Sequence, residues 1–455
     1  MSYILLIALR WEEHILTDLQ SRSSWWRGVI GAAILIAGCI ASFSYIFGGG
    51  SWNTLSQLEA AQFSTIATTE LFGTTSYQNT SPSSSLTSRL SKWRGLTSFE
   101  QPLSMLQGQL LPVAYQGTLS TSQQGSLFSS VQQFGQTNQR IVMGWIPYAN
   151  PVQTIHLIQA NAGLNVASPL WLSLKSSDGS VSSKIEPSVV QYAHQHHVQV
   201  WALVDNQFNA GLSHQVLSNP NARNNLVSNL VSLATKNHLD GLNIDFENMQ
   251  SQDQQGFTDF IKSLHQALVG KHIVLSVDIT PDIQFLQDSA AYFHAALAGY
   301  ADYVVLMAYD EHWSTDQTPG PVADLPWVTT SIEDLLDTGV PADKLVLGVP
   351  FYARFWHVHQ DGSVDSIAVP LSEVDSILKQ HQATSSFNQQ LGVAYARYSK
   401  PDGYEEVWFS TQETLNRELQ LVQNDNLAGV SIWSLGLSDP TSWSSVIHGL
   451  TQMLS

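Results

Sequence analysis

Short apolar segments that alternate with amphipathic helical segments limit the fold of this chain more than any other feature. From Arg140 onward, runs of apolar residues predict strands, and turn residues or helical patterns separate them. The predicted strands are Ile141–Tyr148, Leu170–Leu174, Val198–Val204, Gly241–Phe246, Ile273–Ile279, Tyr303–Ala308, Leu345–Phe351 and Gly429–Trp433. Strands that alternate with helices favour a parallel α/β fold. Eight such units in succession predict a (β/α)8 barrel, in which helices surround a closed parallel sheet.

Two of the predicted helices have recognisable ends. One runs from Pro220 to Lys236, with Asn219 placed to cap it and a proline at its first position. The other runs from about Gln252 to Val269, and Gly270 follows it as a stop signal. Both carry their apolar residues on one face, which predicts that they pack against the sheet.

The stretch from Asp240 to Glu247, which reads DGLNIDFE, places polar residues on an otherwise apolar strand. Alternation with period two puts Asn243, Asp245 and Glu247 on one face. Two carboxylates on a buried face are costly unless they are paired or used, and neighbouring carboxylates do not both ionise cheaply. One of them is therefore expected to hold a proton near neutral pH, as a general acid requires. The alternative is a hydrogen-bonded acidic cluster that only stabilises the core.

DGLNIDFE resembles the signature of glycoside hydrolase family 18, Asp-x-x-Asp-x-Asp-x-Glu. Asp240, Asp245 and Glu247 match this pattern residue by residue, whereas Asn243 stands where the family more often has Asp. The same departure is typical of the branch that resembles spore-germination and cortex-lytic glucosaminidases. The resemblance extends from Arg140 to about Gln452 and implies a small α+β insertion after strand seven, at about 357–407, that forms one wall of a substrate groove.

The ends of the other predicted strands support this resemblance, because active sites of such barrels lie at the carboxyl ends of strands. Strand six ends in Met-Ala-Tyr-Asp, strand seven in Pro-Phe-Tyr-Ala-Arg, and strand eight in Ser-Ile-Trp-Ser, all similar to segments of the family. Strand three lacks the Ser-x-Gly-Gly motif of many chitinases, which disfavours a plain chitinase. The candidates for contact with the sugar are Tyr148, Asn206, Met307, Asp310, Tyr352, Arg354 and Trp433.

The resemblance implies a substrate-assisted reaction in which the 2-acetamido oxygen of the sugar attacks the anomeric carbon. Glu247 is then the acid and later the base, and Asp245 orients the acetamido group. Tyr309 donates to the acetamido oxygen, and Trp433 forms the floor of the sugar site. Asp310 contacts sugar hydroxyls or holds Tyr309.

Asp240 and Asn243 are expected to surround and tune Asp245. The substrate implied is a polysaccharide that contains N-acetylglucosamine, with peptidoglycan or spore cortex preferred and chitin oligomers as the alternative. A binding barrel without turnover is the alternative of another class, and the presence of Glu247 disfavours it.

No cofactor is expected, because no phosphate-binding loop or dinucleotide motif is present in the sequence. His194, His196 and His197 lie close together at a predicted helix end, but no Cys or carboxylate has metal-ligand spacing to them. No metal is therefore predicted at the site. The excess of 37 acidic over 19 basic residues argues against nucleic acid as a partner. We expect a monomer.

The amino-terminal part of the chain predicts a membrane anchor. Residues 29–47 are mostly apolar and long enough to span a bilayer, with Trp and Arg residues at their amino edge. No Lys or Arg follows until Arg89, so residues 1–28 are expected in the cytoplasm and the catalytic part outside. Residues 48–138 are rich in Ser, Thr and Gln and predict a spacer before a catalytic domain at 139–455. Two alternatives are a buried core helix and a lipobox-like Ile36–Cys39 segment that is cleaved and lipidated at Cys39.

Overall fold

The structure is a computed structural model that describes residues 140–147, 149–281, 288–438, 443–444, 446–447 and 449–450. The predicted cytoplasmic segment, membrane anchor and spacer, together with Tyr148 and Cys39, lie outside these described residues. Among the described residues, none of the helices is both long enough and apolar enough to cross a bilayer.

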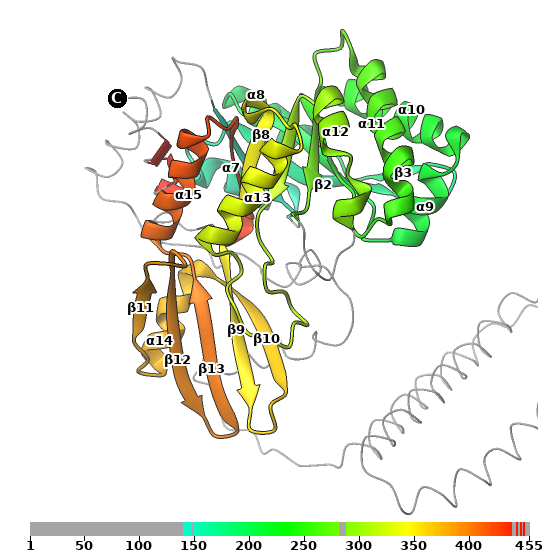
Figure 1. The fold of residues 1–455 in the computed structure, drawn as a ribbon. Coiled ribbons are helices and arrows are strands. Elements are labelled where there is room, and N and C mark those ends of the chain that lie inside the picture. Colours follow the sequence, from blue (N-terminus) through cyan, green and yellow to red (C-terminus); the bar gives the residue numbers. More distant parts are fainter. Residues whose placement is uncertain are drawn as a thin grey trace, which may run out of the picture. The chain divides into compact units, whose positions relative to one another are not determined.

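Eight parallel strands close into the predicted barrel, which is therefore confirmed (Figure 1). The barrel strands are β1 (Ile141–Ile146), β2 (Val166–Leu174), β4 (Gln199–Asp205), β5 (Gly241–Asp245), β6 (Val274–Ile279), β7 (Tyr303–Met307), β8 (Leu345–Pro350) and β14 (Gly429–Trp433). Pairing of β1 with both β14 and β2 closes the ring, and the short strand β3 (Val181–Ser183) adds to β2 in antiparallel orientation. The second strand begins earlier than expected, at Val166.

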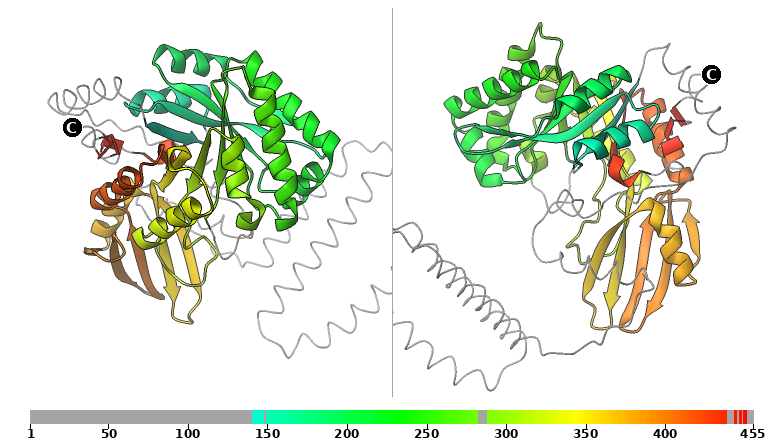
Figure 2. Two further views of the ribbon diagram at one scale, coloured as in Figure 1. Left: turned by 45° about the horizontal axis from the view of Figure 1, so that its top comes forward. Right: turned by 180° about the vertical axis from the view of Figure 1, so that it is seen from behind.

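Helices lie on the outside of this barrel (Figure 2). They are α7 (Pro151–Ala160), α8 (Pro187–Gln195), α9 (Ala210–Leu217), α10 (Pro220–Lys236), α11 (Gln254–Leu268), α12 (His294–Tyr300), α13 (Leu325–Asp337) and α15 (Gln412–Asn424). Helix α10 has the predicted bounds, and the side chain of Asn219 caps it by accepting hydrogen bonds from two backbone N–H groups. Helix α11 begins two residues later than expected because a short 3₁₀ turn, Ser251–Asp253, precedes it.

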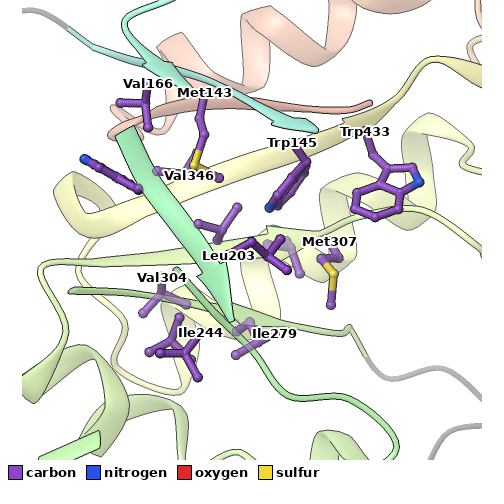
Figure 3. Packing of buried hydrophobic residues seen from close by; sticks show 14 of the residues in the cluster. Met143, Trp145, Val166, Leu203, Ile244, Ile279, Val304, Met307, Val346 and Trp433 are labelled. Carbon is purple, nitrogen blue, oxygen red and sulfur yellow. The ribbon is translucent and has the colours of Figure 1, made fainter. Parts of the chain in front are cut away.

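Large side chains fill the interior of the barrel, as Figure 3 shows for Met143, Trp145 and Leu203. Trp145 is fully buried, and its indole lies next to β8. A Cβ atom at Gly348 would lie 3.2 Å from the Trp145 ring and 2.6 Å from the backbone oxygen of Leu306. Only glycine therefore fits at this position while a tryptophan occupies the barrel centre.

A five-stranded antiparallel sheet is inserted between β8 and α15, below the barrel in Figure 1. Its elements are β9 (Tyr352–His359), β10 (Val364–Pro370), α14 (Leu371–Gln380), β11 (Ser385–Asn388), β12 (Val393–Lys400) and β13 (Gly403–Phe409). The insertion is wider than the expected range of 357–407, because β9 starts only one residue after β8 ends. Helix α14 covers one face of this sheet and buries Phe355 and Val407 beneath Ile377 and Leu378.

Helix α15 carries one acidic residue in an apolar setting, Glu418. Its side chain is buried, and its Oε2 has no hydrogen-bond partner in the part of the chain that the structure describes. Burial raises the pKa of its carboxyl to about 8. Because the folded pKa exceeds the ordinary value of 4.5, the stability that depends on this proton is fully present below about pH 4.5 and is lost as pH rises through about 8.

The change Glu418→Gln is therefore expected to stabilise the fold at about pH 9 by an amount on the order of a few kcal/mol, and to have little effect at about pH 5. Urea unfolding of the parent and the variant at both pH values measures this. Glu413→Gln on the exposed side of the same helix is the control, and its effect should stay within about 1 kcal/mol at either pH. The prediction would be contradicted if the free energy of unfolding of Glu418→Gln differed from that of the parent by the same amount at both pH values.

Candidate active site

The stretch that reads DGLNIDFE forms β5 and the loop that follows it, at the carboxyl end of the fourth barrel strand. Strand β5 is buried along its whole length, because it lies between β4 and β6 in the closed sheet. Asn243 is fully buried and Asp245 is 7% exposed, whereas Glu247 is only partly buried. Glu247 therefore reaches the barrel mouth, where a substrate can meet it, and Asp245 lies one layer deeper.

The backbone of Glu247 is fixed from the neighbouring strand. The buried side chain of Asn206, which follows β4, accepts a hydrogen bond from the Glu247 N–H at 3.1 Å and donates to its carbonyl oxygen at 2.6 Å. Tyr292 donates to the carbonyl oxygen of Phe246 at 2.8 Å. Three bonds therefore hold the acidic loop rigidly before any ligand binds, which is the preorganisation that a catalytic acid needs.

A buried polar network lies below Asp245 in the barrel interior. The Asn243 side chain accepts hydrogen bonds from Trp145 Nε1 and Ser168 Oγ, both at 3.0 Å, and donates to Asp278 Oδ1 at 2.5 Å. Trp145 Nε1 also donates to Asp278 Oδ2 at 3.1 Å. Asp278 is 1% exposed, and its pKa is raised well above the ordinary value, first by burial and then by the charge of Asp245. The barrel thus holds a second carboxyl that is coupled to Asp245.

Aromatic rings surround the carboxylates at the same end of the barrel. Trp433 from β14 lies 5.7 Å from Trp145 between ring centroids, and Figure 3 shows the two side by side. The Tyr309 ring lies nearly parallel to Trp433 at 6.2 Å. The Tyr309 hydroxyl is buried and has no hydrogen-bond partner among the described residues, and burial together with the charges of Asp245, Asp278 and Glu247 raises its pKa well above the ordinary value.

The ends of β7 and β8 meet in a second group of contacts. Tyr352 donates from its hydroxyl to Asp310 Oδ1 at 2.5 Å, and Arg354 Nη2 lies 3.8 Å from the same oxygen. Burial raises the pKa of Asp310, while Arg354 and Tyr352 lower it. Tyr352 and Arg354 are 2% and 1% exposed, and Met307 is 6% exposed. These three side chains therefore form the packed support of the mouth. Asp310 pairs with Tyr352 and Arg354, and it makes no hydrogen bond to the Tyr309 hydroxyl that it was expected to contact or hold as an alternative to sugar hydroxyls.

Two predicted placements are wrong. Asp240 lies at the opposite end of β5 from Glu247, where its Oδ2 accepts from Val200 N and pairs with His194, both at 2.8 Å. It therefore caps the amino end of the sheet and does not surround Asp245. Asn206 was expected to contact the sugar, but its buried side chain is occupied by the Glu247 backbone and Ser213. Tyr148 lies outside the described residues.

Sequence reasoning missed Asp278 and Trp145. Asp278 is the only acidic residue in the apolar strand β6, which is the same signal that drew attention to Asp245. Trp145 lies within the predicted strand Ile141–Tyr148, where nothing in the pattern singles it out. The role of Asp278 depends on the register between β5 and β6, and the role of Trp145 on contacts that cross the barrel from β1 to those strands. Sequence patterns specify neither.

Residues 113–437 match the family described as glycosyl hydrolases family 18. The chain is 29% identical over 282 residues to the uncharacterized glycosylase YvbX of Bacillus subtilis, a match that covers 60% of this chain and 81% of the relative. It is 26% identical over 246 residues to the cortical fragment-lytic enzyme of Bacillus subtilis, covering 53% of this chain and only 57% of the relative.

Among solved structures, a chitinase from Chromobacterium violaceum has a similar fold, with a TM-score of 0.61 at 23% identity over 68% of this chain and 99% of the chitinase. The family match alone covers well over half of the sequence. The family predicted from DGLNIDFE is confirmed, and the chain belongs to glycosyl hydrolases family 18.

Proposed function

We propose that this family 18 glycosidase hydrolyses β-1,4 bonds of N-acetylglucosamine-containing polymers by substrate-assisted retaining catalysis. Tyr309 is the single observation that carries the proposal. Its buried hydroxyl has no partner among the described residues, and it lies close enough to Asp245 and Glu247 for their charges to act on it. Such a donor is costly to leave unpaired, and an acetamido carbonyl oxygen of a bound sugar supplies the acceptor that it lacks.

In the proposed reaction, Glu247 protonates the leaving oxygen from its place at the barrel mouth and later deprotonates the attacking water. Asp245 accepts a hydrogen bond from the acetamido N–H and stabilises the positive charge of the oxazolinium-like intermediate. Tyr309 donates to the acetamido oxygen, and Trp433 forms an aromatic floor beside it, within 6.2 Å of the tyrosine ring. The acetamido group is therefore obligatory.

The usual family pattern has an acid at position 243. In this chain we assign its role, a carboxyl that holds a proton close to Asp245, to Asp278. Asn243 cannot exchange a proton, but its amide donates to Asp278, whose charge is coupled to that of Asp245. We assign the active state a proton on Asp278 and a negative charge on Asp245. In this active state the two carboxyls do not both carry a negative charge in the buried interior.

Peptidoglycan of the spore-cortex type is the preferred polymer, and chitin oligomers are the alternative. The cortical fragment-lytic relative and Asn243 favour the first. The test incubates the full chain with purified peptidoglycan, with N-acetylglucosamine oligomers and with fully de-N-acetylated oligomers, and measures new reducing ends. Cleavage of an acetylated polymer only is expected. Cleavage of the de-N-acetylated oligomers at a similar rate would exclude substrate assistance. The acetylated polymer that is cleaved faster, peptidoglycan or the N-acetylglucosamine oligomers, identifies the preferred substrate.

We also propose that residues 29–47 anchor the enzyme in a membrane as an uncleaved span, with the catalytic domain outside the cytoplasm. The charge-free apolar run and the basic residues before it support this topology. The full chain is expected in the membrane fraction of expressing cells, and external protease should release a catalytic fragment. The size of the membrane-bound chain separates the alternatives, because cleavage before Cys39 removes residues 1–38 whereas an uncleaved span keeps them. Cys39→Ser should leave that size unchanged for an uncleaved span and increase it for a cleaved lipoprotein. Recovery of the intact chain in the soluble fraction would refute both. The enzyme is proposed to act as a monomer without nucleic acid.

A further inference from the structure

The inserted sheet carries a polar cluster at its end away from the barrel. On strand β9, residues 353, 355, 357 and 359 point to one face, and the first two pack under helix α14. Beyond the helix, the same face continues with His357 and His359, and Asp402 lies in the turn between β12 and β13. In Figure 1, this end of β9 and β13 points away from the barrel, so the cluster is separate from the catalytic residues.

His357 is the most buried residue of this cluster. It is 6% exposed, and neither of its ring nitrogens has a hydrogen-bond partner among the described residues. Its Nε2 nevertheless lies 3.2 Å from Asp402 Oδ1, and His359 Nδ1 lies 3.6 Å from Asp402 Oδ2. The ligand atoms of the three residues all lie within 4.8 Å of one another.

These separations fit a shared metal ion. Two donor atoms that each lie about 2.0 Å from a tetrahedral ion are separated by about 3.3 Å. The two nitrogen–oxygen distances of 3.2 and 3.6 Å bracket this value, and a direct hydrogen bond from His357 to Asp402 is absent despite the short distance. The buried nitrogen and the carboxylate are therefore placed to bind the same ion rather than each other.

Carboxylates on the far side of the two histidine rings also favour a metal site. His359 Nε2 lies 2.8 Å from Asp365 Oδ2, and His357 Nδ1 lies 3.9 Å from Glu405 Oε1. Histidines that bind metals usually have a carboxylate on their other ring nitrogen, which fixes the tautomer and increases the basicity of the ligand. His359 has such a carboxylate at hydrogen-bond distance, and Glu405 brings a negative charge 3.9 Å from His357 Nδ1 without a hydrogen bond to it.

The local charge favours a divalent cation. Asp365, Asp402 and Glu405 bring three carboxylates, and the cation paired with them is Lys400, 3.1 Å from Glu405. With neutral histidines, this group carries two excess negative charges. Imidazole nitrogen and carboxylate oxygen together suit Zn²⁺, whereas Ca²⁺ and Mg²⁺ prefer oxygen ligands alone.

We propose that His357, His359 and Asp402 form a binding site for a transition-metal dication, Zn²⁺ by preference. The side chain of Asp402 is 62% exposed, so solvent can reach an ion from its side. Because the histidines lie on β9 and the aspartate in the β12–β13 turn, the ion ties two hairpins of the insertion together. Gln360 already joins the same turns by donating from its backbone N–H to the Asp402 carbonyl oxygen at 2.9 Å. The expected consequence is a metal-dependent stability of the insertion, independent of the catalytic chemistry.

The test strips the full chain with a chelator and titrates it with zinc chloride by calorimetry, with magnesium and calcium chloride in separate runs. One zinc ion per chain, an increase in Tm with zinc and no response to the other two metals are expected. Asp402→Asn and His359→Gln alter exposed or partly exposed side chains, so they should fold normally while losing at least about tenfold in zinc affinity. Asp365→Asn should lose about tenfold through its effect on His359.

His214→Gln is the matched control, because His214 also pairs with a carboxylate, at 2.6 Å from Asp253, but belongs to no group of three possible metal ligands among the described residues. It should bind zinc as the parent does. The proposal is overturned if the parent binds no stoichiometric zinc, or if binding survives unchanged in both Asp402→Asn and His359→Gln. An equal loss in His214→Gln would likewise refute it, since zinc would then bind to histidines at large.

Discussion

Glu247→Gln is expected to lower kcat on the preferred polymer by about 10²- to 10⁴-fold, because glutamine cannot donate the proton that the leaving oxygen requires. The KM should change little, since Gln keeps the size of the side chain and the backbone remains fixed by Asn206. Release of reducing ends, followed over a range of polymer concentrations, separates the two constants.

Glu311 is a rival for the acid, because burial and the nearby Asp324 raise its pKa to about 7. Its geometry argues against it, since its Oε2 accepts a hydrogen bond from the Asp324 backbone at 2.9 Å and so supports the loop after β7. Glu311→Gln should therefore retain activity within a few-fold of the parent. If Glu311→Gln is the inactive variant and Glu247→Gln cuts normally, the assignment of the acid is wrong.

The parent and Glu247→Gln together also distinguish an enzyme from a binding barrel without turnover. Glu247→Gln should still bind the polymer in a sedimentation assay, because Trp433 and the other aromatic residues of the mouth are unchanged. A parent that binds the polymer as well as the variant, and releases no reducing ends from any acetylated substrate, would favour the binding barrel.

The sequence predicted the barrel well, because each strand is short, apolar and bounded by a helix or a turn. Helix α10 was located to the residue because Asn219 and Pro220 encode its start directly. The insertion was placed with wrong edges, since β9 continues from β8 with one residue between them and no turn residue marks the boundary.

The candidate site was predictable where it depends on positions within one strand. Alternation along β5 brought Asn243 and Asp245 to one face, and strand ends supplied Tyr309 and Trp433. What the sequence could not predict are contacts between strands, such as Asn243 with Asp278. Asp240 was misplaced for a related reason, because a family motif shows which residues belong together but not that a five-residue strand separates its ends.

Asp278→Asn is expected to lower kcat by about ten- to a hundredfold with little change in KM, since substrate does not contact this buried residue. The amide offers one acceptor oxygen where the carboxyl offers two, so the side-chain donor of either Asn243 or Trp145 loses its acceptor at position 278. Ser276→Ala is the matched control on the same strand, because the Ser276 hydroxyl is buried and has no hydrogen-bond partner within the described ranges of the chain. Its kcat and KM should stay close to those of the parent.

The pH dependence of the rate separates a proton-holding Asp278 from a packing residue. The pKa of Asp278 is raised by burial and by Asp245, so in the parent a second negative charge forms beside Asp245 as pH rises through that raised value. The proposed active state is then lost, and the rate falls. Asparagine stays neutral at every pH, so the alkaline limb of the Asp278→Asn profile should move to higher pH.

The double variant Asn243→Asp/Asp278→Asn tests whether the carboxyl can act from position 243. It keeps one carboxyl and one amide in the network with their positions reversed. It should recover much of kcat and bring the alkaline limb back towards its place in the parent. An Asp278→Asn profile that is lower at every pH but unchanged in shape would mean that Asp278 only holds the barrel together. In that case no neighbouring carboxyl holds a proton for Asp245, and Asp278 does not replace the acid that the family usually has at position 243.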